Sequence, residues 1–300
     1  MKVLKEWFIE VPWGKIALIS WGNAQGKPVL LIHGRQDSSA TFIPLLELLP
    51  KNYYYVGIDL PGHGKSDAFP IGVALTRFLP VVAIDMVVKH LGWKEFYYIG
   101  HSMGSEQGLF YNALHPKQII KLILLDPGPA LSRLVLDNFT NFYTYYDDYY
   151  TNYTTYNIDN RLYTKEQAVA SVMRARGMTE EQADIILSRN LIKVGDNCYR
   201  LSWDKRTKKL VPTNFPTEYY YEIFSTYIPP TLYIHANQSN IFNTKGKEII
   251  DRLVKKMEEN NQNFKVLRVD GTHDVHFINP KCFSDELTIF FKNSDVISKL

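Results

Sequence analysis

The sequence lacks the features that mark several large classes of protein. Its only two cysteines, Cys198 and Cys282, are too few for a disulfide framework or a cysteine-rich metal cluster. Its 34 basic and 31 acidic residues give a net charge of +3, which offers no argument for nucleic acid or an anionic membrane as the main partner. There is no run of about 18 apolar residues, and the first residues lack the apolar stretch of a secretory signal. We therefore expect neither a transmembrane segment nor a cleaved leader.

What the chain does have is an alternation of apolar strands and helical segments. Its 300 residues, 45% of them hydrophobic, suit one large α/β domain or one domain that carries an insertion. Because the strands are almost wholly apolar, they predict a mainly parallel sheet covered by helices on both faces. After an opening hairpin over residues 5–21, the predicted strands are residues 28–32, 53–60, 96–99, 119–125, 231–235 and 264–269, and the predicted helices are residues 75–91, 105–114, 245–259 and 284–291.

The segment Gly100-His101-Ser102-Met103-Gly104 matches the pattern G-x-S-x-G and lies between a predicted strand and a predicted helix. That context is typical of a nucleophile elbow, in which a strained turn exposes the serine hydroxyl above the sheet. Ser102 is therefore the candidate nucleophile. The backbone N–H of Met103 would stabilise an oxyanion, and we expect the second amide from Arg35, in the loop after the first apolar strand.

A serine hydroxyl needs a base within hydrogen-bond reach and an acid that orients this base. Among the eight histidines, His273 is the best placed, because it follows the last predicted strand late in the chain. This position suits the order serine, acid, histidine of such sheets. His276, three residues further on, is the alternative base.

The alternation of strands and helices breaks after residue 129. Residues 131–160 are rich in tyrosine, and their aromatic density argues against low-complexity disorder. We interpret residues 130–227 as a mostly helical cap over an apolar cleft, inserted into a core formed by residues 1–129 and 228–300. The elements predicted within the cap are two helices with capping-box patterns, 164–176 and 179–190, a hairpin that pairs 199–203 with 208–211, and a short aromatic helix over 216–227.

Four motifs occur in order at the ends of predicted strands. They are His33-Gly34, Asp59-Leu60-Pro61-Gly62-His63-Gly64-Lys65-Ser66, the elbow, and Gly271-Thr272-His273. Together they resemble the α/β-hydrolase superfamily over nearly the whole chain. This resemblance implies the α/β-hydrolase fold, with a mostly parallel central sheet, helices on both faces and an inserted, mostly helical cap.

A narrower resemblance involves three further segments. They are Gly271-Thr272-His273-Asp274-Val275-His276, Tyr199-Arg200-Leu201-Ser202-Trp203-Asp204-Lys205-Arg206, and the C-terminal Ser298-Lys299-Leu300. In these segments the chain is similar to the serine hydrolase-like proteins.

The resemblance also implies where the acid of a catalytic triad lies. The superfamily's usual acid follows the next-to-last core strand, but here that loop, His235 to Asn240, contains no carboxylate. The superfamily's other acid position directly follows the strand after the nucleophile helix, where this sequence has Asp126. Asp126 is thus the predicted acid, although it could instead only stabilise the turn at Pro127-Gly128. Asn240 as a neutral acceptor, or no acid at all, are the alternatives.

These residues predict a serine hydrolase that cleaves a carboxylic ester or thioester of a largely apolar acyl group through an acyl-enzyme, with no metal or other cofactor. Because the elbow holds Ser102 in place of an aspartate, epoxide opening and halide displacement are disfavoured. The alternative function is a non-catalytic small-molecule binding protein with an impaired triad. The tripeptide Ser298-Lys299-Leu300 is the peroxisomal address S-K-L, which predicts an import receptor as a partner and a peroxisomal location, otherwise a cytoplasmic one.

Overall fold

The computed structural model describes residues 1–134, 146–147, 149–152, 161–208, 210–211, 215–240 and 244–293. Most of the tyrosine-rich tract and the tripeptide Ser298-Lys299-Leu300 lie outside these residues. Among the described helices, none has both the length and the hydropathy needed to cross a membrane.

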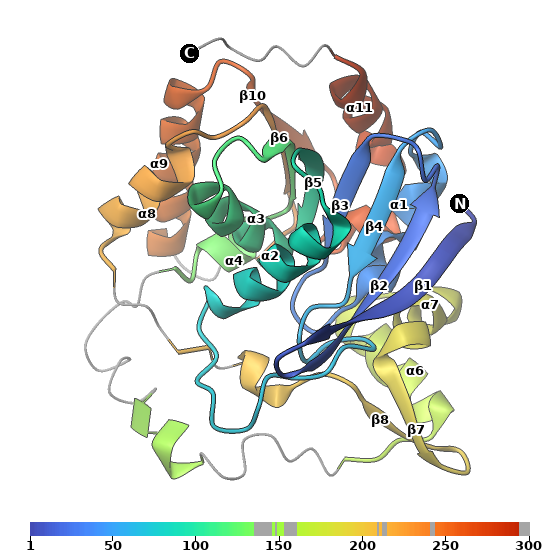
Figure 1. The fold of residues 1–300 in the computed structure, drawn as a ribbon. Helices are drawn as coiled ribbons and strands as arrows, with labels where there is room; N and C mark the ends of the chain where they lie inside the picture. The colour runs from blue at the N-terminus through green and yellow to red at the C-terminus, as the bar shows by residue number, and fades with distance from the viewer. Residues whose placement is uncertain are drawn as a thin grey trace.

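An eight-stranded sheet runs through the centre of the molecule (Figure 1), in the order β1-β2-β4-β3-β5-β6-β9-β10. β1 and β2 form the predicted opening hairpin, β2 is also antiparallel to β4, and every later pair of neighbours is parallel. Because parallel strands end on the same side, the loops after them meet at one edge of the sheet, where ligands bind in open α/β folds. The strands are β1 (Val3–Val11), β2 (Gly14–Gly22), β3 (Pro28–Ile32), β4 (Tyr54–Ile58), β5 (Phe96–His101), β6 (Ile119–Leu125), β9 (Thr231–Ala236) and β10 (Phe264–Val269).

Helices cover both faces of this sheet, as predicted. On one face α2, α3, α8 and α9 share an apolar cluster with the strands, and on the other face α1, α10 and α11 do so. The mainly parallel α/β architecture predicted from the apolar strands is therefore confirmed. The helices are α1 (Ile43–Leu48), α2 (Leu79–Leu91), α3 (Met103–Leu114), α4 (Gly128–Leu131), α6 (Lys165–Arg176), α7 (Glu180–Asn190), α8 (Thr217–Ser225), α9 (Thr244–Asn260), α10 (Val275–Ile278) and α11 (Lys281–Lys292), with 3-10 turns η1 (Ser39–Phe42) and η2 (Lys205–Lys208).

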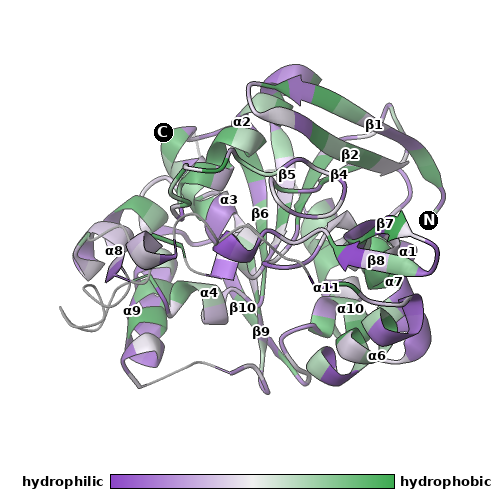
Figure 2. Cartoon of the chain, turned by 90° about the horizontal axis from the view of Figure 1, so that it is seen from below, coloured by the Kyte–Doolittle hydropathy of each residue, from purple (hydrophilic) through white to green (hydrophobic). Residues whose placement is uncertain are grey.

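The residues between β6 and β9, called the insert below, contain α4, α6, α7, β7 (Leu191–Gly195), β8 (Cys198–Leu201), η2 and α8. Both predicted capping boxes are present, with Thr164 and Thr179 each accepting a hydrogen bond from the N–H three residues later. α6 and α7 share a small apolar cluster of their own, joined by Phe277 of α10. In Figure 2 hydrophilic residues are gathered on the outer side of α6. The division into a core and a cap at residues 130 and 227 stays a prediction.

The predicted pairing of residues 199–203 with 208–211 is wrong. β8 (Cys198–Leu201) pairs instead with β7 (Leu191–Gly195), the strand before it. The turn between them contains Asn197, whose φ of 45° is a left-handed conformation that asparagine tolerates well in tight hairpins. The chain therefore turns before β8, where no turn was predicted.

Tertiary contacts explain why residues after β8 form η2 instead of a hairpin turn. The Arg206 guanidinium donates to the Asp204 carboxylate, with Nη2 2.8 Å from Oδ2, and to the carbonyl oxygen of Pro70 at 2.8 Å. The Arg206 backbone N–H also donates to Asp204 Oδ1 at 2.9 Å. These bonds fix the segment against the loop after β4, which a pattern of local turn residues does not reveal.

Candidate active site

Ser102 lies at the sharp turn between β5 and α3, with φ 52° and ψ −114°. Such a conformation is strained for a residue with a side chain, and it is a common feature of functional sites. A Cβ on Gly100 would lie 2.4 Å from the carbonyl oxygen of Gly104, and one on Gly104 would lie 2.0 Å from that of Ile32. The two glycines are therefore required by the close approach of strand and helix, as the elbow pattern predicts.

The structure brings His273 next to this serine. Its Nε2 is 2.8 Å from Ser102 Oγ, and its Nδ1 is 2.6 Å from Asp126 Oδ2. The serine hydroxyl donates to Nε2 and the Nδ1–H donates to the carboxylate, which fixes the tautomer of the ring. This arrangement can remove the proton from Ser102 while the carboxylate stabilises the imidazolium that forms.

Asp126 directly follows β6 and is 1% exposed. Its Oδ1 accepts a hydrogen bond from the N–H of Ala236 at 3.1 Å, and its Oδ2 accepts one from the Ser239 hydroxyl at 2.5 Å. The loop after β9 thus holds the carboxylate, although it supplies none itself. Asn240 in the same loop is exposed and makes no hydrogen bond with His273 in the described structure.

Two backbone amides were predicted as oxyanion donors. Met103 is the first residue of α3, so its N–H has no acceptor within the helix. A Cβ on Gly34 would lie 3.3 Å from Ser102 Cβ, so the loop that continues into Arg35 passes close to the serine. Among the described residues, neither N–H donates a hydrogen bond to another group. Both are thus free to donate, and their role in an oxyanion hole stays a prediction.

The alternative base, His276, points elsewhere. Its Nε2 is 2.7 Å from Thr41 Oγ1, and its ring stacks on His101 with 3.8 Å between ring centres. His101 in turn donates from Nε2 to the carbonyl oxygen of His273 at 3.0 Å. The described structure shows no hydrogen bond between His276 and Ser102. His276 and His101 therefore support the loop of the candidate base.

One group of buried residues, His101, Asp274 and His276, is close enough to be considered as metal ligands, with donor atoms within 4.8 Å of one another. The two rings are only 29° from parallel. Their in-plane lone pairs therefore run side by side and do not converge on one point. Arg176 Nε lies 3.7 Å from Asp274 Oδ2, and its positive charge disfavours a cation there. The group does not fit a metal ion.

Four histidines around the site are buried, and burial lowers the pKa of each. The pKa falls to about 4 for His33 and to about 3 for His63. For His101 and His276 it falls well below the usual value. All four side chains are therefore neutral in the folded protein near neutral pH.

We expect the protein to lose stability as the pH falls from about 6.5 toward 4. In this range the unfolded chain takes up protons at these histidines and the folded protein does not, so each histidine lowers the free energy of unfolding by up to about 1.4 kcal/mol per pH unit. Urea denaturation at about pH 7, 6 and 5.5 would measure this dependence on the two sides of the unfolded pKa. His63→Asn removes one such group, so its pH dependence should be shallower by about one proton. The same pH dependence in both proteins would contradict the prediction.

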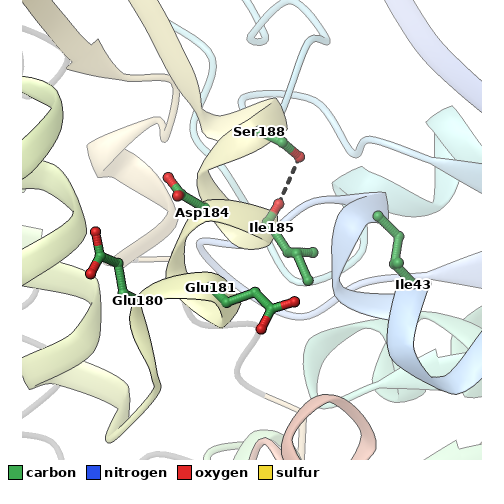
Figure 3. Close-up of a pocket in the computed structure, with 6 residues that line it drawn as sticks. All are labelled: Ile43, Glu180, Glu181, Asp184, Ile185 and Ser188. Carbon is green, nitrogen blue, oxygen red and sulfur yellow. Dashed lines mark hydrogen bonds between the residues drawn. The ribbon is translucent and has the colours of Figure 1, made fainter.

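One hollow lies beside α7, and another lies beside Met103. Figure 3 shows a pocket between α7 and Ile43 of α1, in which the carboxylates of Glu180 and Asp184 point away from the isoleucine side chains while that of Glu181 extends toward their side. It contains none of the residues around Ser102. A second, narrow cavity of about 20 Å³ is mostly apolar, and Met103 forms part of its wall. Its other lining residues are Leu60, Pro61, His63, Phe69, Leu75, Thr76, Leu79, Pro80, Thr207 and Leu210.

Sequence reasoning missed several residues that support the site. Ser239 holds the candidate acid, and the available signal was a short polar residue at the end of the strand next to β6. Thr41 and Arg176 gave no such signal, because their partners lie more than 90 residues away in the sequence.

The sheet order, the elbow and the serine–histidine–aspartate contacts define an α/β hydrolase. A sequence model of the alpha/beta hydrolase fold family matches residues 27–280, and the chain belongs to this family. Within it the chain belongs to the serine hydrolase-like branch, as the motifs predicted. It is 31% identical to a serine hydrolase-like protein of Danio rerio, over 97% of this chain and 89% of the relative.

A second relative carries the same family name, and a solved structure shares the fold. The chain is 27% identical to serine hydrolase-like protein 2 of Homo sapiens, over 97% of this chain and 95% of the relative. The crystal structure of a hypothetical protein from Pseudomonas aeruginosa shares the fold, with a TM-score of 0.79 and 21% identity over 96% of this chain and 98% of that one. The fold and these relatives support a hydrolase that acts on a small molecule.

Proposed function

We propose that the chain is a serine hydrolase that cleaves a carboxylic ester or thioester of a largely apolar acyl group. The observation that carries this proposal is the continuous hydrogen-bonded path from Ser102 Oγ through the His273 ring to Asp126, with distances of 2.8 and 2.6 Å. The His273 side chain is 34% exposed, so a substrate can reach the ring from outside.

The proposed reaction proceeds in two halves. Ser102 Oγ attacks the substrate carbonyl carbon while His273 Nε2 takes the serine proton, and the N–H groups of Met103 and Arg35 donate to the oxyanion. His273 then returns the proton to the departing alkoxide or thiolate, which leaves the acyl group bound to Ser102. A water molecule, deprotonated by the same ring, releases the acid and restores the serine.

The narrow cavity beside Met103 is the observation that favours an apolar acyl group in the substrate. Its walls come mostly from Leu, Pro and Phe side chains, and one wall is the residue that follows the nucleophile. A cavity of about 20 Å³ does not hold an acyl chain as it stands, so its walls must move to admit one. The flexible Met103 side chain is the wall that can move most easily.

Labelling with a fluorophosphonate probe tests the proposal against a non-catalytic binding protein. We expect the folded protein to be labelled on Ser102 and the Ser102→Ala variant to remain unlabelled. A panel of p-nitrophenyl esters and acyl-CoA thioesters of increasing chain length then defines the acyl group. A folded protein that neither reacts with the probe nor hydrolyses any of these compounds would support the binding protein instead.

A further inference from the structure

Arg176 lies at the end of α6, where the insert meets two loops of the candidate active site. It is the last residue of the helix, before Gly177 ends the helix in a left-handed conformation with φ 65°. Its Nη2 is 3.0 Å from Asp37 Oδ2, and its Nε is 3.7 Å from Asp274 Oδ2. One guanidinium group therefore contacts two carboxylates that are 237 positions apart in the sequence.

The first carboxylate belongs to the loop of the predicted oxyanion donor. Asp37 lies two residues after Arg35, its side chain is fully buried, and its Oδ1 accepts a hydrogen bond from the N–H of Ser38 at 2.9 Å. Gln36 between them has a φ of 57°, a left-handed conformation that a residue with a side chain adopts only when its surroundings hold it there. The ion pair with Arg176 supplies one such contact.

The second carboxylate belongs to the loop of the candidate base. Asp274 directly follows His273, and its carbonyl oxygen accepts hydrogen bonds from the N–H groups of Phe277 and Ile278 at the start of α10. A shift of the Asp274 side chain would therefore move the adjoining imidazole. Since the reacting atoms must stay within a few tenths of an ångström of alignment, such a shift lowers the rate.

The charges make this contact hard to replace. Burial alone would lower the pKa of the Arg176 guanidinium, but Asp37 and then Asp274 outweigh it and raise that pKa. Without the arginine, two buried carboxylates would face each other with no countercharge, and the loops would separate or rearrange. A lysine keeps the charge but offers a single nitrogen, which cannot reach in two directions as a guanidinium does.

We propose that Arg176 is a positioning residue that holds the oxyanion-donor loop and the His273 loop in fixed positions relative to each other. The site is then complete only when α6 is packed against these two loops. The effect on catalysis rests on the proposed ester or thioester hydrolysis. The effect on the two loops does not depend on it.

Arg189 of α7 provides a matched control. It is also a buried arginine of the insert, and its Nη2 is 2.8 Å from Asp59 Oδ2 while its Nη1 is 2.7 Å from Glu6 Oε1. It thus fixes the insert to the sheet, and because Asp59 also accepts hydrogen bonds from the N–H and hydroxyl of Ser39, it is linked to the end of the first loop but not to the His273 loop. A detached insert would affect both variants, whereas displacement of the His273 loop is expected only when Arg176 is replaced.

The test compares Arg176→Met and Arg176→Lys with Arg189→Met. With a p-nitrophenyl ester that the wild type hydrolyses, we expect Arg176→Met to lower kcat by about 100-fold with KM little changed, because misalignment is felt in the transition state. Arg176→Lys should fall in between, and Arg189→Met should retain more of the activity than Arg176→Met. Equal losses in the two methionine variants would overturn the proposal.

Amide hydrogen exchange provides a readout that needs no activity. In Arg176→Met we expect faster exchange in both residues 34–38 and 272–278, whereas in Arg189→Met residues 272–278 should exchange as in the wild type. Unchanged exchange, or faster exchange in only one loop, would refute the positioning role. If the wild type shows no Ser102-dependent hydrolysis, the proposed function fails while the exchange data still decide the role of Arg176. Should Arg176→Met not fold, Arg176→Lys serves for both measurements.

Discussion

Replacing His273 with alanine is expected to lower kcat/KM for ester hydrolysis by about 10⁴-fold or more. Without the ring, no other described side chain accepts the Ser102 proton, because the Oγ bonds only to His273 Nε2. The hydroxyl would then have to attack as a neutral, weak nucleophile. Initial rates with a p-nitrophenyl ester at enzyme concentrations high enough to detect residual turnover would measure this loss.

His276→Ala is the matched control for that experiment. His276 is fully buried, lies three residues from His273, and supports its loop through Thr41 and the stacked ring of His101. We therefore expect this variant to lose part of its activity together with some thermal stability, and to keep turnover that His273→Ala does not have. Equal losses of activity in the two variants would overturn the assignment of His273 as the base.

The parts of the fold that sequence reasoning found are those that depend on local patterns. β3, β5 and β6 are short, nearly pure apolar runs, and such runs become central strands because both of their faces must be buried. The elbow was found for a similar reason, since only glycine at position 100 lets β5 lie so close to α3, and only glycine at position 104 lets α3 lie so close to the end of β3. These features were recognised because the constraint and the residue lie within a few positions of each other.

The parts that sequence reasoning missed depend on distant contacts. α1 is only six residues long and begins without a side-chain cap, so its apolar residues gave no helical signal. The false hairpin after β8 arose because Asp204 and Arg206 look like turn residues, whereas their side chains bind each other and the loop after β4. Local propensity is a weak guide wherever such tertiary contacts decide the backbone.

In the candidate site, too, residues marked by a local pattern were found and residues placed by distant contacts were harder to identify. Ser102 and His273 were selected by motif and by their position at strand ends. Asp126 was selected as the acid only through a resemblance, and Asn240 or no acid at all remained as alternatives. The structure places Asp126 against the His273 ring because β6 and β9 are neighbours and the loop after β9 binds the carboxylate. That adjacency is a property of the sheet order, which one sequence does not specify.

Asp126→Asn is expected to lower kcat/KM by about 10³-fold to 10⁴-fold. The asparagine amide can donate to His273 Nδ1, which would place the ring proton on Nε2 and leave that atom unable to accept the Ser102 proton. The amide oxygen can still accept a hydrogen bond from the N–H of Ala236 or the Ser239 hydroxyl, so we expect the fold to be retained. Ester hydrolysis and thermal unfolding, measured on the same preparation, separate the loss of rate from a loss of structure.

Asn240→Ala distinguishes the two acid positions that the sequence left open. Asn240 is exposed and has no hydrogen bond to His273 among the described residues, so this variant should hydrolyse esters at nearly the wild-type rate. If Asp126→Asn instead keeps a tenth or more of the wild-type activity while Asn240→Ala loses most of it, the imidazole is oriented by the amide during turnover. The hydrogen bond of 2.6 Å between His273 and Asp126 would then serve the fold and not the reaction.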